Sequence, residues 1–221
     1  TAQELCTYFA AHAVGTNKLL DDESKKEMQR THFRAKVPGQ DNDEDYALGL
    51  EIEYLSKRKT IGHGGGFPGH ITKSLADSKD ELVMVALTNC IDGPAQSIVK
   101  GIYGIIDYFQ ENTPATKPKH DMSKFEGRYM NLWGMTDIVV TGDKVIATYI
   151  NTWHPLSFPE ELEYINETTL KVTETDSFSS EGELVHFSLK GNKVETINYN
   201  GSTMWPEDVW MAKQKQRKIV N

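Results

Sequence analysis

Apolar residues recur at helical spacing at the start of the chain. Thr1 and Glu4 form a capping box, and Leu5 and Phe9 follow on one face. A capped segment with one apolar face predicts an amphipathic helix. A second short helix is expected over residues 22–31.

Strand patterns follow between the first helices and residue 90. Residues 46–54 alternate apolar with polar or acidic side chains, which predicts one strand with one buried face. Two more strands are expected at 59–63, with a glycine-rich turn after it, and at 71–75. The apolar run LVMVALTN, residues 82–89, is typical of a central strand. Short connections between these strands predict an antiparallel sheet.

A further amphipathic helix follows the strands. Ile98, Ile102, Ile105 and Phe109 repeat at helical spacing, and this face is predicted to pack on the sheet. The segment ENTPATKPKHDM then contains two prolines and no apolar period, as expected of a linker. We therefore divide the chain into an α+β domain over 1–112, a linker over 113–122 and a last domain over 123–221.

The last domain has a β-rich pattern. Eight candidate strands, among them RYMNL, TDIVVT, KVIATYI and VWMAKQ, are separated by turn signals such as TGD and KGN. Their spacing of about ten residues predicts an up-and-down barrel or a sandwich, and we favour the barrel.

Composition excludes several classes of function. The 221 residues include 24 Lys and Arg against 32 Asp and Glu, a net charge of −8, with no basic patch that would bind nucleic acid. No stretch approaches the ~18 consecutive apolar residues of a membrane-spanning helix. The two cysteines, Cys6 and Cys90, are far apart, so neither a disulfide framework nor a zinc site is indicated.

The stretch TIGHGGGFPGH, residues 60–70, contains the most informative chemistry. Glycines at a strand end let a substrate approach the backbone, and their N–H groups can stabilise an oxyanion. A wide hairpin turn is the alternative. HGGG also occurs in α/β-hydrolase lipases, but that fold needs a GxSxG nucleophile, which this sequence lacks, and βαβ units.

Taken together, YALGL (46–50), IGHGGGFPG (61–69), LVMVALTN and the following helix resemble the C-terminal part of the penicillin-binding-protein-like serine hydrolases. This family includes class C β-lactamases, DD-peptidases, D-aminopeptidases and esterases. Its motifs, in chain order, are Ser-x-x-Lys, Tyr-x-Asn or Tyr-x-Ser, and Lys-Thr-Gly or His-x-Gly. The resemblance covers residues 1–112 and implies the C-terminal portion of a β-lactamase/transpeptidase-like domain.

The resemblance implies roles for four residues. His63 matches the Lys/His position of the third motif, Gly64 its middle position and Gly65 its glycine. Gly66 would supply an N–H to the oxyanion hole. Gly64 lacks the hydroxyl that a threonine offers to a substrate carboxylate, which disfavours β-lactam recognition.

Formal matches to the other two motifs occur in the wrong order or element for the family: Ser97 with Lys100, Ser56 with Lys59, Tyr149 with Asn151, and Tyr164 with Asn166. We therefore expect the nucleophile and the general base in an N-terminal part of the same protein that precedes this chain. The 221-residue piece alone is expected to be inactive. Its uncovered apolar surface is expected to make it a homo-oligomer.

By resemblance, the whole protein is a serine hydrolase of amide substrates (D-residue peptides, β-lactams) or small esters. The resemblance implies no metal or organic cofactor and an extracytoplasmic or membrane-facing location. The residues themselves give only weak metal signals. Asp41, Asp43 and Asp45 alternate as in a calcium loop, but Tyr46 replaces the required glycine, so a solvated acidic loop is favoured. His63 and His70 have no third ligand nearby.

The last domain resembles the lipocalin-like accessory domains of some family members, through KFEGRYMN and MWPEDVWMAK. It holds all four tryptophans: Trp133, Trp153, Trp205 and Trp210. Core and rim anchoring is favoured over a ligand-lining role. Two alternatives to an enzyme stay open: a non-catalytic peptide or peptidoglycan binder, and a barrel that binds a small ligand or partner.

Overall fold

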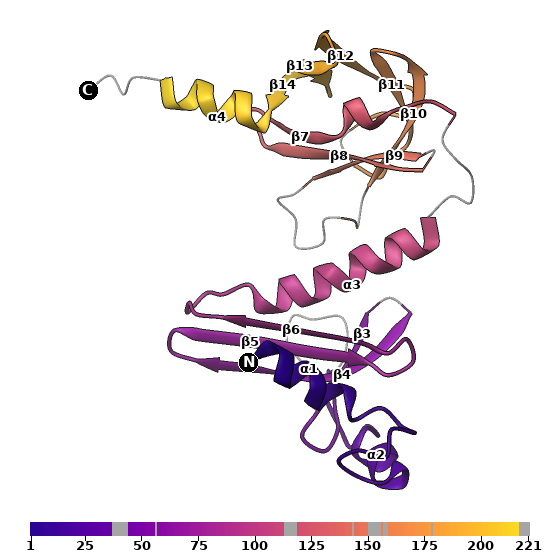
Figure 1. Ribbon diagram of the computed structural model, residues 1–221, viewed down its shortest axis with the longest axis vertical. Helices are drawn as coiled ribbons and strands as arrows, with labels where there is room; N and C mark the ends of the chain where they lie inside the picture. The colour runs from indigo at the N-terminus through magenta and orange to yellow at the C-terminus, as the bar shows by residue number, and fades with distance from the viewer. Residues whose placement is uncertain are drawn as a thin grey trace. The chain divides into compact units, whose positions relative to one another are not determined.

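The chain forms two compact units, Thr1–Ile106 and Asp107–Asn221. Figure 1 shows the computed structural model, which describes residues 1–36, 44–55, 57–112, 119–142, 144–149, 156, 159–177 and 179–216. Most of the predicted linker, residues 113–118, lies outside this range. None of the helices in the described ranges combines the length and apolar character needed to span a bilayer.

The first unit contains a six-stranded antiparallel sheet in the order β1 to β6. The predicted capping box begins its first helix, because Thr1 and Glu4 cap each other's backbone N–H groups. The elements are α1 (Ala2–Ala10), α2 (Asp22–Met28), β1 (Phe33–Ala35), β2 (Glu44–Tyr46), β3 (Glu51–Leu55), β4 (Arg58–Phe67), β5 (His70–Asp77), β6 (Leu82–Thr88) and α3 (Ala95–Asn112).

Helices cover both faces of this sheet (Figure 1). Ala76 packs with Phe9 of α1, whereas its neighbour Leu75 packs with Val99 and Tyr103 of α3. Successive residues of a strand point to opposite faces, so the two helices lie on opposite sides. The predicted α+β architecture with an antiparallel sheet is confirmed.

Three strand predictions were wrong in detail. Residues 46–54 are not one strand: β2 and β3 form a hairpin that turns at Gly49, whose φ of 72° suits a glycine. β4 continues through the three glycines to Phe67, so the turn lies at residues 68–69. The apolar run Leu82–Thr88 forms an edge strand, since β6 pairs only with β5 in the described sheet.

The predicted packing face of α3 was also wrong. Ile98, Ile102 and Ile105 remain 40–42% exposed, whereas Val99 and Tyr103 are buried against the sheet. The Tyr103 hydroxyl donates to the backbone carbonyls of Leu75 at 3.2 Å and Leu82 at 2.9 Å. These bonds fix the orientation of the helix over β5 and β6.

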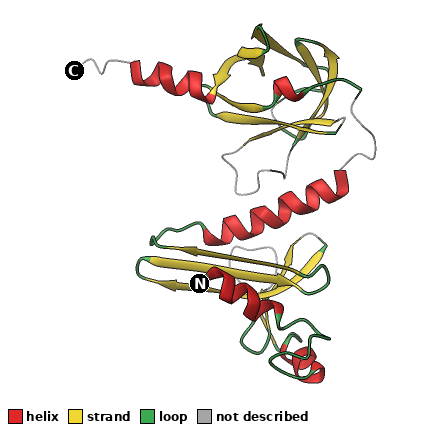
Figure 2. Ribbon diagram, in the orientation of Figure 1, coloured by secondary structure: helices red, strands yellow, loops and turns green. Residues whose placement is uncertain are grey.

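The second unit is a closed eight-stranded antiparallel barrel, which confirms the predicted barrel (Figure 2). VWMAKQ is not one of its strands but lies in a terminal helix, and the eighth strand precedes it. The elements are η1 (Ser123–Phe125), β7 (Gly127–Met130), β8 (Met135–Thr141), β9 (Lys144–Tyr149), β10 (Glu160–Asn166), β11 (Thr169–Glu174), β12 (Leu184–Lys190), β13 (Lys193–Tyr199), β14 (Ser202–Pro206) and α4 (Glu207–Gln216).

Side chains fill the interior of the barrel. Phe125 of η1 packs on Phe187 with ring centroids 4.4 Å apart, and Tyr129 meets the same ring at 6.2 Å. All three side chains are at most 4% exposed. Eight strands enclose a space that side chains can fill, and these aromatic rings form part of that packed core.

Candidate functional site

All four predicted site residues lie on the second half of β4. Gly64, Gly65 and Gly66 pair with Lys73, Thr72 and Ile71 of β5, respectively. The three glycines are therefore part of a sheet ladder, which holds their backbone in a defined direction.

The hydrogen-bonding direction of β4 alternates along these glycines. Phe67 and His70 are the paired residues that close the two-residue turn after β4, and residues in these positions hydrogen-bond to each other. Because bonded and non-bonded pairs alternate in an antiparallel ladder, Gly64 and Gly66 direct their N–H groups away from β5. In agreement, the Gly64 N–H donates to Oε1 of Glu51, on the β3 side, at 3.2 Å.

β3 does not extend alongside this part of β4. Its first residue, Glu51, lies opposite Gly62, and among the described residues no strand pairs with residues 63–67 on that side. By the alternation, the Gly66 N–H points to this open edge, next to the exposed residues Gly65 and Phe67. A fixed N–H that the ladder does not use can bind an oxyanion or an extended peptide.

The glycines of β4 differ in the space around them. A Cβ at Gly62 would lie 1.9 Å from the Ser74 carbonyl oxygen, so the fold itself requires glycine there. At Gly64 and Gly66 the nearest atoms would be 3.7 Å and 3.5 Å away, which is ordinary contact. Packing in this chain therefore does not explain why glycine occupies positions 64 and 66.

His63 lies at the same edge with its side chain 45% exposed. Its Nε2 atom is 2.8 Å from the Tyr46 hydroxyl, and the two rings meet edge to face. Its Nδ1 atom is 2.5 Å from the Gly64 carbonyl oxygen and 3.5 Å from Oε1 of Glu51. Side chains of β2 and β3 and the backbone of β4 thus hold the imidazole in place.

A chain of alternating charges connects this edge to α3. Lys73 is 4% exposed and forms ion pairs with Glu51 and, at 2.5 Å, with Glu53. Glu53 in turn pairs with Lys100 of α3 at 2.5 Å. The Glu51 carboxylate is therefore fixed from one side by a buried cation and from the other by the Gly64 N–H.

The ion pairs outweigh the effect of burial on both central groups. Burial raises the pKa of the Glu53 carboxyl, but hydrogen bonds from Lys100 and Lys73 bring that pKa below 4.5. Burial lowers the pKa of the Lys73 ammonium, but its bonds to Glu51 and Glu53 raise that pKa above 10.5. Both groups are charged at neutral pH.

The sequence patterns do not identify Tyr46 and Glu51 as neighbours of His63, or Lys73 as the partner of Glu51. A single strand over residues 46–54, which the alternation predicts, would keep Tyr46 and Glu51 well separated. The signal that could have united them is Gly49, because a turn there pairs Tyr46 with Glu51.

Formal matches to the two other family motifs lie on α3 and in the barrel. Ser97 and Lys100 lie on α3, where Lys100 is bound to Glu53. In the barrel, Tyr164 donates to Glu167 and Asn166 accepts from Thr168. Ser56 and Asn151 lie outside the described residues.

The structure describes one of the three aspartates that alternate as in a calcium loop. Asp45 pairs with Arg34 at 2.6 Å, while Asp41 and Asp43 lie outside the described residues. Within the described part of the chain, no group of three or more His, Cys, Asp or Glu side chains could hold a metal ion.

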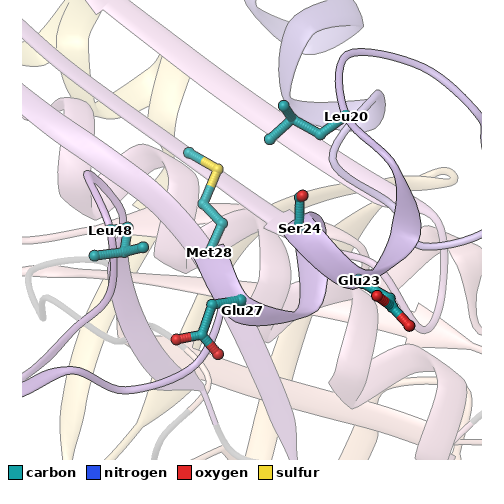
Figure 3. A pocket seen from close by; sticks show the side chains of 6 residues that line it. All are labelled: Leu20, Glu23, Ser24, Glu27, Met28 and Leu48. Carbon is teal, nitrogen blue, oxygen red and sulfur yellow. The ribbon is translucent and has the colours of Figure 1, made fainter.

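A separate hollow of about 530 Å³ is lined by Leu20, Glu23, Ser24, Glu27, Met28 and Leu48. Figure 3 shows the Met28 side chain extending between Leu48 and Leu20, with the carboxylates of Glu23 and Glu27 directed away from its tip. None of the four predicted site residues is part of this lining.

The tryptophans have structural and surface positions. Trp205 and Trp210 stack with ring centroids 5.5 Å apart. Trp133 is 90% exposed at the tip of the β7–β8 hairpin. Trp153 lies outside the described residues.

No protein-family model matches the sequence, and no curated protein matches it. Among solved structures, the octameric penicillin-binding protein homologue from Pyrococcus abyssi is 20% identical, with 91% of this chain and 46% of that chain covered and a TM-score of 0.43. SurE, alone and with D-Leu, is 15% identical over 93% of this chain and 48% or 49% of its own, with a TM-score of 0.38. The chain spans about half the length of these structures.

Proposed function

We propose that the chain is part of a penicillin-binding-protein-like serine hydrolase, which acts on amides or esters through an acyl-enzyme. The observation that carries this proposal is the open edge of β4, where the Gly66 N–H points past the end of β3, on the same strand as His63. A preorganised N–H at a water-accessible edge is what an oxyanion hole requires.

In the proposed reaction, a serine in another part of the protein attacks the substrate carbonyl. The Gly66 N–H and the N–H of that serine stabilise the oxyanion, and His63 orients the substrate or assists proton transfer. The leaving amine or alcohol takes up the serine proton, and water then hydrolyses the acyl-enzyme. Gly64 and Gly65 let the substrate backbone approach β4.

By the same proposal, residues 1–112 are the C-terminal portion of a β-lactamase/transpeptidase-like domain, and residues 123–221 a lipocalin-like accessory domain. Peptides with a D-residue are the favoured substrates, with simple esters next. The protein acts outside the cytoplasm or at a membrane.

Intact mass spectrometry tests this proposal. The product of the complete open reading frame and the 221-residue chain are each treated with a fluorophosphonate and with a penicillin. We expect an adduct on the complete product alone. An adduct on the 221-residue chain would contradict the proposed location of the nucleophile, and the absence of adducts on both would contradict the serine-hydrolase proposal.

A second candidate is a binding module in the barrel. The observation in its favour is the hairpin tip at which Leu132 is 71% and Trp133 90% exposed. Asn131 holds this tip, because its side-chain oxygen accepts the Trp133 N–H at 2.8 Å. Exposed aromatic and apolar side chains on an ordered turn suit partner contacts. If a candidate ligand binds there, titration changes tryptophan fluorescence in the wild type but not in Trp133→Ala.

A further inference from the structure

The two ring nitrogens of His63 have chemically different partners. Nδ1 lies 2.5 Å from the Gly64 carbonyl oxygen, which can only accept a hydrogen bond. In the neutral ring, Nδ1 therefore carries the hydrogen and Nε2 is the acceptor. The Tyr46 hydroxyl, 2.8 Å from Nε2, is then the donor of that bond.

Glu51 favours the same arrangement. Its Oε1 atom lies 3.5 Å from Nδ1, so the carboxylate attracts a hydrogen on that nitrogen. The carboxylate itself cannot easily turn away, because it accepts the Gly64 N–H and pairs with buried Lys73. A carboxylate on one side of an imidazole and a hydroxyl on the other select one tautomer.

We infer that Tyr46 and Glu51 are positioning residues for His63, and that they hold its neutral imidazole with the hydrogen on Nδ1 and with Nε2 as acceptor for the Tyr46 hydroxyl. The catalytic relevance of this inference rests on the proposed function. The open edge of β4 then presents a hydroxyl–imidazole pair rather than a free ring nitrogen.

Nitrogen-15 NMR of the histidine side chains in the 221-residue chain tests the inference directly. Spectra are recorded with increasing pH until the imidazole signals stop changing, and His63→Gln assigns the His63 signals. We expect a protonated Nδ1 and an unprotonated Nε2 in the wild type. In Tyr46→Phe and in Glu51→Gln, the two nitrogen shifts should move toward each other as the second tautomer gains population.

Tyr54→Phe is the matched control, since the Tyr54 hydroxyl lies 3.4 Å from Asp45 and makes its bond there. It should leave the His63 signals unchanged. A wild-type hydrogen on Nε2, or a Tyr46→Phe spectrum identical to that of the wild type, would overturn the inference. These results do not depend on acylation by the fluorophosphonate, so failure of the inference and failure of the proposed function are distinguishable.

Discussion

At the scale of single residues, the glycines of β4 serve different purposes. Gly62→Ala should lower the free energy of unfolding of the first unit by about 1–3 kcal/mol, because the added Cβ would lie 1.9 Å from the Ser74 carbonyl oxygen. Gly64→Ala, with neighbours at 3.7 Å, should change it by no more than about 0.5 kcal/mol.

Urea unfolding followed by far-UV circular dichroism measures this difference. All four tryptophans lie in the second unit, so tryptophan fluorescence in the same samples reports on the barrel. Equal effects of the two substitutions on the first unit would contradict the close approach of Gly62 to β5.

The surroundings of His63 show what sequence patterns cannot predict at this scale. Glycines carry no side chains from which strand alternation could be recognised, so the triple glycine indicates a turn in the sequence although it lies within β4. The neighbours Tyr46 and Glu51 depend on the register of a hairpin, and a shift of one residue would change the face of every side chain.

At the scale of elements, the charge network that joins β3, β5 and α3 makes stability depend on pH. The folded-state pKa of Glu53 lies below 4.5, so its stabilising contribution is present above that pH and is lost as the pH falls through the folded value. The folded-state pKa of Lys73 lies above 10.5, so its contribution is present below that pH and is lost as the pH rises through the folded value. We expect the first unit to lose stability at both extremes.

Urea unfolding followed by circular dichroism as a function of pH checks this expectation, with Lys73→Met as the control. That variant removes the cation between Glu51 and Glu53. It should therefore be less stable than the wild type at neutral pH, and its free energy of unfolding should fall less than that of the wild type in acid. If the free energy of unfolding of Lys73→Met fell in acid as much as that of the wild type, the stabilising role of the charge network would be contradicted.

The helix α3 provides a second test at the scale of elements. Tyr103→Ala should lower the free energy of unfolding of the first unit by about 3–5 kcal/mol. The substitution empties a buried aromatic site and removes the hydrogen bonds to the Leu75 and Leu82 carbonyls. Ile102→Ala, on the exposed face, should lower the same free energy of unfolding by less than about 1 kcal/mol. Thermal unfolding followed by circular dichroism compares the two variants, and a larger loss for Ile102→Ala would contradict this packing.

Element types were largely predictable, whereas their faces and ends were not. The Thr1–Glu4 capping box and the eight short strands are encoded locally, in side chains a few residues apart. On α3, Ile98 and Ile102 alternate with Val99 and Tyr103, so both faces are apolar and periodicity alone cannot select the buried one. VWMAKQ has strand-like composition, but it follows Pro206, Glu207 and Asp208, which are typical of a helix start.

At the scale of the whole molecule, the proposed function implies that apolar surface of the first unit meets another segment of the protein. Phe33, Phe67 and Ile91 are 65–75% exposed. We therefore expect the 221-residue chain to self-associate, with a light-scattering mass of at least twice 24.9 kDa. A stable mass of 24.9 kDa at micromolar concentration would contradict this expectation.

The proposed function requires the Gly66 N–H to line the acyl-transfer site. Its most direct test is amide hydrogen exchange of the complete protein before and after reaction with a fluorophosphonate. The Gly66 amide, which points to the open edge, should exchange rapidly in the free protein and become protected in the adduct, while amides of the barrel strands do not change. Adduct formation without a change in the exchange of the Gly66 amide would contradict the account.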